Sequence, residues 1–141
     1  KHFIIRSSWV YGNGDNFVNR VLKAAEKREL FAVPVGEIGA PTSAKDLARI
    51  ILHLIETNEY GTYHVTCKGS CSRYELAKEV LKLAGKTLQL TEASSVALEQ
   101  PAVRPAYAVL DNFILRIIDV YDMPHWKDSL KEYIEERMVR G

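Results

Sequence analysis

The chain of 141 residues is poor in cysteine and carries almost no excess charge. Three residues separate Cys67 from Cys71, whereas zinc sites and redox motifs usually place two residues between their cysteines. Two free thiols in a reducing cytoplasm are therefore expected. Nineteen basic residues are scattered among eighteen acidic ones, for a net charge of +1. This balance gives no basic patch for a nucleic-acid partner or for an anionic membrane surface.

Long hydrophobic runs are also missing. No apolar stretch approaches the roughly 18 residues that a membrane-spanning helix needs, and no segment has the pattern of a signal peptide. The four histidines, His2, His53, His64 and His125, lack the spacing of metal ligands. We interpret them as surface or structural residues. These absences favour a cytoplasmic globular protein, and 141 residues suffice for one domain with a hydrophobic core.

The sequence does contain a regular alternation of strand and helix patterns. Strands are predicted over 2–6, 30–34, 61–66 and 88–93, and helices over 16–27, 43–55, 72–84, 111–120 and 125–138. Ser43 with Asp46 and Ser72 with Glu75 have the spacing of capping boxes, and Gly85 has the position of a helix-ending glycine. This alternation predicts an α/β protein with a parallel sheet. Ligands bind such sheets outside the carboxyl ends of the strands, where residues 7–11 would lie.

Four motifs occur in one order: "SSWVYG" at 7–12, "GAPTSAKDLA" at 39–48, "GTYHVT" at 61–66 and "RPAYAVLDN" at 104–112. With this order and spacing, the chain resembles the C-terminal half of dTDP-4-dehydrorhamnose reductase, an extended short-chain dehydrogenase/reductase. The resemblance implies that residues 1–141 hold the last strands of a Rossmann-type parallel sheet and the small nucleotide-sugar domain. It also implies reduction of dTDP-4-dehydro-6-deoxy-L-mannose to dTDP-L-rhamnose by NADPH or NADH, in the biosynthesis of cell-wall polysaccharide.

Part of that family's machinery precedes the strand that opens this chain. The glycine-rich dinucleotide fingerprint, the catalytic Ser/Thr and the Tyr-x-x-x-Lys pair belong there. We therefore expect the N-terminal dinucleotide-binding half to be absent, no catalytic residue to lie here, and the fragment alone to be inactive. No cofactor is expected to bind it tightly, although NADPH, with Mg²⁺ as an option, would serve the whole enzyme. A homodimer is a further option.

Two local patterns imitate functional motifs. Tyr74 and Lys78 form a Tyr-x-x-x-Lys, but they follow the Ser72 capping box on a later helix than the family's catalytic pair. We interpret Tyr74 as a packing residue rather than a proton donor. The segment 12–14, Gly-Asn-Gly, invites a phosphate-loop interpretation because it precedes a helix, yet a plain turn is favoured. Asp111 with Asn112 is predicted to cap the following helix.

The resemblance assigns roles to individual residues. It places Ser7, Ser8 and Val10 beside the nicotinamide of the cofactor. It places Trp9 as a wall of the sugar pocket, where an apolar indole would exclude water from hydride transfer. The other residues expected to bind the substrate are Asn16, Phe17, Glu37, Gly39, Pro41, Thr42 and, near the diphosphate, Arg104. A plain core aromatic is the alternative for Trp9, and a surface arginine for Arg104.

Two positions depart from the family pattern. Glu37 stands where the family has a neutral Gln, and Ala108 stands where it has a Ser. A carboxylate near a diphosphate is unfavourable unless a cation offsets it. Both departures leave the identity of the sugar nucleotide open. They also weakly favour an alternative, a non-catalytic regulatory subunit of the same fold that binds a dinucleotide.

Overall fold

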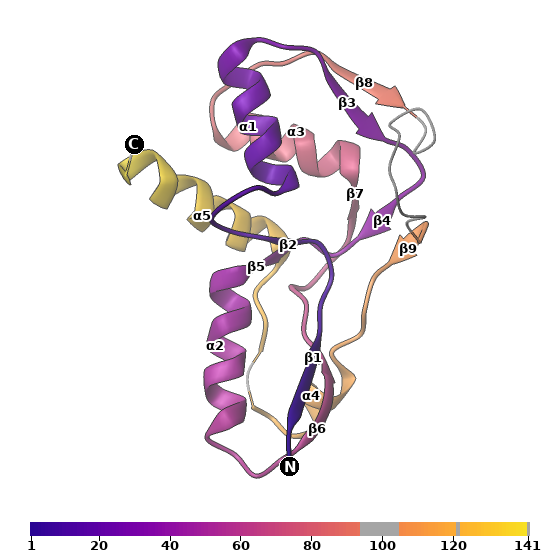
Figure 1. Ribbon diagram of the computed structural model, residues 1–141, viewed down its shortest axis with the longest axis vertical. Coiled ribbons are helices and arrows are strands. Elements are labelled where there is room, and N and C mark those ends of the chain that lie inside the picture. The colour runs from indigo at the N-terminus through magenta and orange to yellow at the C-terminus, as the bar shows by residue number, and fades with distance from the viewer. Residues whose placement is uncertain (94–104, 121, 141) are drawn as a thin grey trace.

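The structure is a computed structural model that describes residues 1–93, 105–120 and 122–140 (Figure 1). The strands are β1 (Phe3–Arg6), β2 (Val10–Tyr11), β3 (Phe31–Pro34), β4 (Ile38–Gly39), β5 (Thr42–Ser43), β6 (Gly61–His64), β7 (Cys71–Ser72), β8 (Leu90–Ala93) and β9 (Tyr107–Ala108). The helices are α1 (Phe17–Lys27), α2 (Ala44–Ile55), α3 (Arg73–Leu83), α4 (Phe113–Ile117) and α5 (Trp126–Arg140). The predicted α/β architecture is confirmed.

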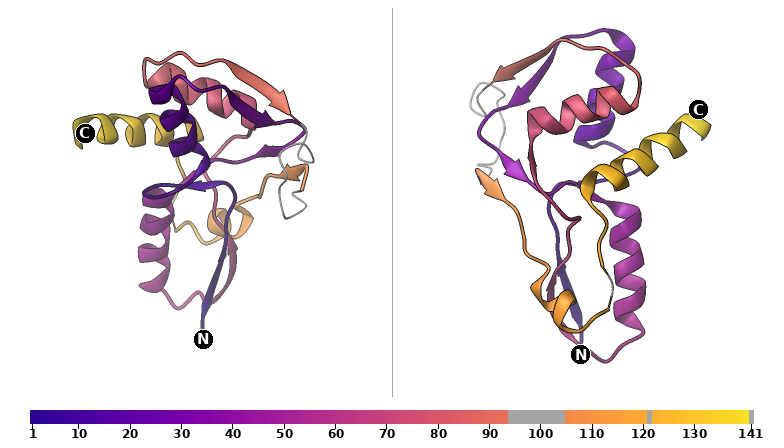
Figure 2. Two further views of the ribbon diagram at one scale, coloured as in Figure 1. Left: turned by 45° about the horizontal axis from the view of Figure 1, so that its top comes forward. Right: turned by 180° about the vertical axis from the view of Figure 1, so that it is seen from behind.

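The elements form a lower and an upper group. β1 pairs in parallel with β6 in the lower group, with α2 along one side and α4 against β6 (Figures 1 and 2). The upper group holds the parallel pair β3–β8 together with α1 and α3, which pack on each other. Between the groups lie the parallel pair β2–β5 and the sheet β7–β4–β9, in which β7 and β4 are antiparallel.

One hydrophobic core runs through both groups. Its buried members include Val21 of α1, Ile50 of α2 and Val80 of α3, each fully enclosed. Helix α5 contributes Leu130 and Ile134 to the same cluster. Because these side chains come from four helices, the core fixes how the two groups meet. The residues that connect the two groups, after β1 and around β4, are therefore fixed between the lower and the upper part of this core.

Local signals explain where helix α3 begins and ends. The Ser72 side chain accepts a hydrogen bond from the Glu75 backbone N–H, and the Glu75 carboxylate accepts one from the Ser72 N–H, so the predicted capping box is confirmed. Hydrogen bonds that the Ser72 backbone N–H and hydroxyl donate to the Glu75 carboxylate hold the pKa of that carboxyl below its usual range. At the other end, Gly85 has a φ of 62°, and its N–H and that of Lys86 donate to carbonyls of the last turn.

The start of α2 differs in part from its prediction. Ser43 caps the helix, accepting from the N–H groups of Lys45 and Asp46. The return contact of a capping box does not form, because one oxygen of Asp46 accepts from Arg49 at 2.8 Å. Its other oxygen is buried and has no hydrogen-bond partner among the described residues. Asp46 is therefore an ion-pair residue rather than half of a capping box.

The predicted cap at residues 111 and 112 is wrong. Asn112 occupies the N-cap position of α4, but its side chain makes no capping hydrogen bond. Instead its amide group donates to the carbonyl of Thr66 and accepts from the Thr66 N–H, at 2.7 and 2.9 Å. Asp111 pairs with Arg116. Asn112 thus pairs with the backbone of the segment that follows β6. Helix α4 has five residues, whereas ten were predicted (residues 111–120).

Candidate functional site

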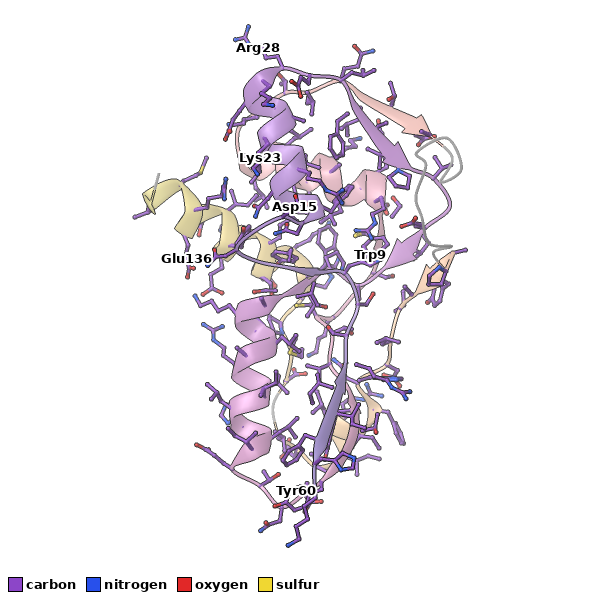
Figure 3. The ribbon with its side chains drawn as sticks, viewed as in Figure 1. Trp9, Asp15, Lys23, Arg28, Tyr60 and Glu136 are labelled. Atoms are coloured by element: carbon purple, nitrogen blue, oxygen red, sulfur yellow. The ribbon has the colours of Figure 1, made fainter. Side chains whose placement is uncertain are left out.

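Trp9 lies between the lower and upper groups, beside β4 (Figure 3). It follows β1 and has a φ of 43°, in the left-handed region that costs a residue with a side chain roughly 1–2 kcal/mol. Its carbonyl accepts a hydrogen bond from the Thr42 N–H at 3.2 Å. The loop thus aims a half-buried indole toward β4. Strained backbone of this kind is common where a side chain has a function to serve.

The indole lies directly on Gly39. A Cβ atom at Gly39 would lie 2.3 Å from Cε2 of Trp9, closer than any real contact. The sequence predicted a close approach at this glycine, but by a ligand. The structure shows that Trp9 itself makes the approach. The absence of a side chain at position 39 is therefore a condition for the position of the ring.

A cation that the sequence analysis did not single out covers the same indole. The guanidinium carbon of Arg73 lies 3.7 Å from the centroid of the Trp9 ring and 5.0 Å from that of Phe17. Arg73 is the first residue of α3, so the capping box at Ser72 sets its position. Stacking of a guanidinium on an indole contributes about 1–2 kcal/mol when it is partly desolvated. Arg73 therefore links α3 to the loop after β1.

Arg73 also supplies the cation that Glu37 requires. Its Nε donates to Oε2 of Glu37 at 3.1 Å, and the two side chains are only 15% and 8% exposed. The condition set by the sequence, a cation to offset this carboxylate, is thus met within the chain. The other oxygen of Glu37 is buried and has no hydrogen-bond partner among the described residues.

The other residues predicted to face the substrate lie at the edges of this cluster. Phe17 opens α1 and packs edge-on against Phe31 at 5.8 Å. Asn16 caps α1 and donates to the carbonyls of Gly12 and Gly14, so its amide is committed to the loop. These hydrogen bonds agree with a turn at residues 12–14.

Pro41 and Thr42 are buried beneath the same loop. The Thr42 hydroxyl donates to the Ala40 carbonyl and accepts from the Cys67 N–H. It therefore holds backbone together inside the chain. Arg104 lies outside the described residues, and Ala108 is half-buried in β9, beside Gly39 of β4.

The residues expected beside the nicotinamide follow the carboxyl end of β1. Ser7 donates to the Val65 carbonyl at 2.8 Å and so joins the ends of β1 and β6. The Ser8 hydroxyl is buried, with no hydrogen-bond partner among the described residues. Val10 is 45% exposed on β2. Among the three residues, Ser7 is thus committed to the chain, Ser8 is enclosed and Val10 faces outward.

The two imitations of functional motifs have structural explanations. Tyr74 packs on the hydrophobic core, and the Lys78 ammonium lies 5.7 Å from its ring centroid.

No three His, Cys, Asp or Glu side chains of the described ranges gather as a metal-binding group. No helix in the described part of the chain is long and apolar enough to cross a bilayer.

The parallel strands, the helices beside them and a tryptophan at the carboxyl end of β1 define the class. This is the architecture of Rossmann-type extended short-chain dehydrogenase/reductases, as in the solved structures that superpose on the chain. A model of the family described as the RmlD substrate binding domain matches residues 1–139. The chain belongs to that family, and its resemblance to the C-terminal half of dTDP-4-dehydrorhamnose reductase is confirmed.

Individual relatives agree with this assignment. The chain is 37% identical over 135 residues to the spore coat polysaccharide biosynthesis protein SpsK of Bacillus subtilis, covering 95% of this chain and 47% of that protein. It matches the dTDP-4-dehydrorhamnose reductase structure from Clostridium acetobutylicum with a TM-score of 0.90 and 39% identity, covering 96% and 49% of the two chains. The Bacillus anthracis reductase in complex with NADP gives a TM-score of 0.91 and 36% identity, with the same coverage. The chain thus spans about half the length of the relatives it matches.

Proposed function

We propose that this chain is the nucleotide-sugar-binding half, residues 1–141, of an NADPH-dependent cytoplasmic reductase. The reaction would convert dTDP-4-dehydro-6-deoxy-L-mannose to dTDP-L-rhamnose. The names of the relatives support this reaction, and they do not favour the alternative of a regulatory subunit. The observation that carries the proposal is the indole of Trp9, held against Gly39 and Arg73 at the carboxyl end of β1.

In this proposal Trp9 forms an apolar wall against the deoxysugar. Such a wall keeps water away from the carbon that receives the hydride. Phe17 and Glu37 border the same space, with Arg73 neutralising the carboxylate. Arg104 would contact the diphosphate, because a guanidinium fork matches phosphate oxygens. Asn16, Gly39, Pro41 and Thr42 would shape the pocket through backbone, since the Asn16 and Thr42 side chains are already hydrogen-bonded.

The cofactor side of the site would be the segment 7–10. The buried hydroxyl of Ser8, which has no hydrogen-bond partner within the described ranges, fits a polar group of a bound dinucleotide, and one reductase relative was solved in complex with NADP. Bound there, the reduced nicotinamide would supply the hydride for the 4-keto carbon. Ser7 would keep the ends of β1 and β6 together beside it. The groups that move the proton would lie in the other half of the enzyme, and Mg²⁺ and a homodimer stay predictions.

The proposal is tested in the full-length protein that contains this chain. Trp9→Ala should lower kcat/KM for the keto-sugar by about tenfold or more, since an apolar wall contributes roughly 1–3 kcal/mol. Tyr74→Phe is the matched control, an aromatic on α3 that should leave turnover within about twofold because its hydroxyl serves no proton transfer. The 141-residue chain alone should not oxidise NADPH. Unchanged kcat/KM in Trp9→Ala, or a protein that does not reduce the keto-sugar, would contradict the proposal.

A further inference from the structure

The Arg73 guanidinium joins three groups that come from separate parts of the chain. It stacks on Trp9 at 3.7 Å, lies 5.0 Å from the Phe17 ring and forms an ion pair with Glu37 at 3.1 Å. Trp9 follows β1, Phe17 opens α1 and Glu37 precedes β4. The two aromatic residues are predicted to face the substrate, so the cation between them affects both.

The ion pair restricts where the guanidinium can lie. Both side chains are largely enclosed, and a Glu37 oxygen accepts directly from Nε. An arginine guanidinium is planar and can stack on a ring while it donates in its own plane. Lysine has the same charge but no plane to stack. The arrangement therefore requires arginine at position 73. A solvated surface charge at this position could be either arginine or lysine.

Trp9 has a strained backbone that one hydrogen bond, from the Thr42 N–H to its carbonyl, helps to hold. Its φ of 43° is unfavourable for a residue with a side chain, so contacts of the ring must hold this conformation. The ring packs against the edge of the hydrophobic core, lies on Gly39, which offers only backbone, and is covered by the Arg73 guanidinium. Of Gly39 and Arg73, only Arg73 has a side chain that can hold the indole.

We propose that Arg73 is a positioning residue for the sugar-binding wall: it fixes the Trp9 ring, and Glu37 orients Arg73 by the buried ion pair. This inference rests on the proposed function for its effect on catalysis, but its effect on the indole is independent of it. Arg73 acts through Trp9 and does not itself contact the reacting atoms.

The test uses the full-length protein and the variants Arg73→Met, Arg73→Lys, Glu37→Gln and Arg73→Met/Glu37→Gln. Arg73→Met should raise KM for the keto-sugar about tenfold and leave kcat within about threefold, since the wall binds substrate and does not transfer protons. Arg73→Lys should recover less than half of that loss, because it restores charge without stacking. The double variant should bind the sugar better than Arg73→Met, because it leaves no buried carboxylate without its cation.

A second measurement follows Trp9 directly. The indole N–H resonance of Trp9, assigned by its loss in Trp9→Phe, should shift in Arg73→Met while that of Trp126 stays in place. Arg49→Met is the matched control, because Arg49 also pairs with a buried carboxylate, that of Asp46, but belongs to α2. It should move neither the Trp9 resonance nor KM for the keto-sugar.

The outcomes separate this inference from the proposed function. A wild-type protein that does not reduce the keto-sugar sinks the proposed function, while a shifted Trp9 resonance in Arg73→Met still supports the positioning role. An unshifted Trp9 resonance with unchanged KM overturns the positioning role. The positioning role is also overturned if Arg73→Met raises KM equally for NADPH and for the sugar and the double variant binds the sugar no better. That pattern would indicate a general loss of structure.

Discussion

The contact between Gly39 and the Trp9 ring makes Gly39→Ala a sharp perturbation of the site. The new methyl carbon would lie 2.3, 2.5 and 2.7 Å from three atoms of the indole. Comfortable carbon–carbon contacts begin near 3.5 Å, so the ring must move by roughly 1 Å. Overpacking of this kind costs about 1–3 kcal/mol, and weaker stacking on Arg73 adds about 1 kcal/mol. We therefore expect a loss of about 2–4 kcal/mol in the free energy of unfolding.

The measurement is urea unfolding of the chain, combined with kcat/KM for the keto-sugar in the full-length protein. Displacement of Trp9 should lower kcat/KM by about tenfold, which corresponds to about 1.4 kcal/mol. Gly36→Ala, in the segment just before β4, is the matched control. Gly36 has a φ of 77°, and no described atom lies within 4 Å of its would-be Cβ, so alanine there strains the backbone by about 1–2 kcal/mol without touching Trp9.

A double variant identifies the cause. In Trp9→Ala the bulky ring is gone, so the further change Gly39→Ala should cost less than about 1 kcal/mol, and the two changes should be strongly non-additive. Additive effects of the two substitutions would refute the reasoning. Equal losses of stability and of kcat/KM in Gly39→Ala and Gly36→Ala would refute it as well, since only one of these glycines lies under the indole.

The remaining predictions concern helix α3 and the cysteines. Ser72→Ala should destabilise the chain by about 1 kcal/mol in urea. Because the pKa of Glu75 is lowered in the folded state, its contribution is present above its unfolded pKa and lost as pH falls through the folded pKa. Glu75→Gln should therefore flatten the acid limb of the stability curve, and an unchanged limb would contradict this. Burial raises the pKa of Cys71 to about 12 and raises that of Cys67. Both thiols stay protonated at pH 8 and should therefore resist iodoacetamide until urea is added. The free energy of unfolding should fall as pH rises above the unfolded pKa of the cysteines. Labelling of the native protein as fast as the denatured protein would contradict the first expectation.

The order and type of the long elements could be predicted from the sequence because each has its own local signal. Apolar spacing predicts α1, α2 and α3, and Ser72, Glu75 and Gly85 mark the ends of α3 by hydrogen-bonding chemistry that acts within a few residues. The short strands β2, β4, β5, β7 and β9 have two residues each. Two residues show no periodicity, so only their partners in space define them as strands.

The sequence indicates a member of the candidate site where a single residue stands out by its type and position. It does not indicate a member that is defined by its contact with a distant residue. Trp9 stands out as an aromatic after a strand. Arg73 does not, because an arginine in the first turn of an amphipathic helix has the pattern of a solvated charge. The only available sign was Glu37, whose carboxylate requires a cation. The sequence does not show which of the nineteen basic residues answers that need. The role of Asn112 escapes local prediction for a similar reason, since its partner Thr66 lies 46 residues away.

The pairing of Glu37 with Arg73 changes what the departure at position 37 means. A lone carboxylate facing a diphosphate would weaken binding of a nucleotide sugar, and so would weakly favour a non-catalytic role. A carboxylate that shares its charge with a stacked guanidinium adds no net charge to the pocket, and it orients the cation that holds the indole. Positions 37 and 73 are therefore energetically coupled: a neutral residue at 37 would remove the ion pair that orients the Arg73 guanidinium, and a neutral residue at 73 would leave the buried Glu37 carboxylate without that cation. Glu37 in place of the family's Gln thus fits the proposed nucleotide-sugar site, in which an ion pair replaces a neutral side chain, better than it fits a non-catalytic regulatory subunit.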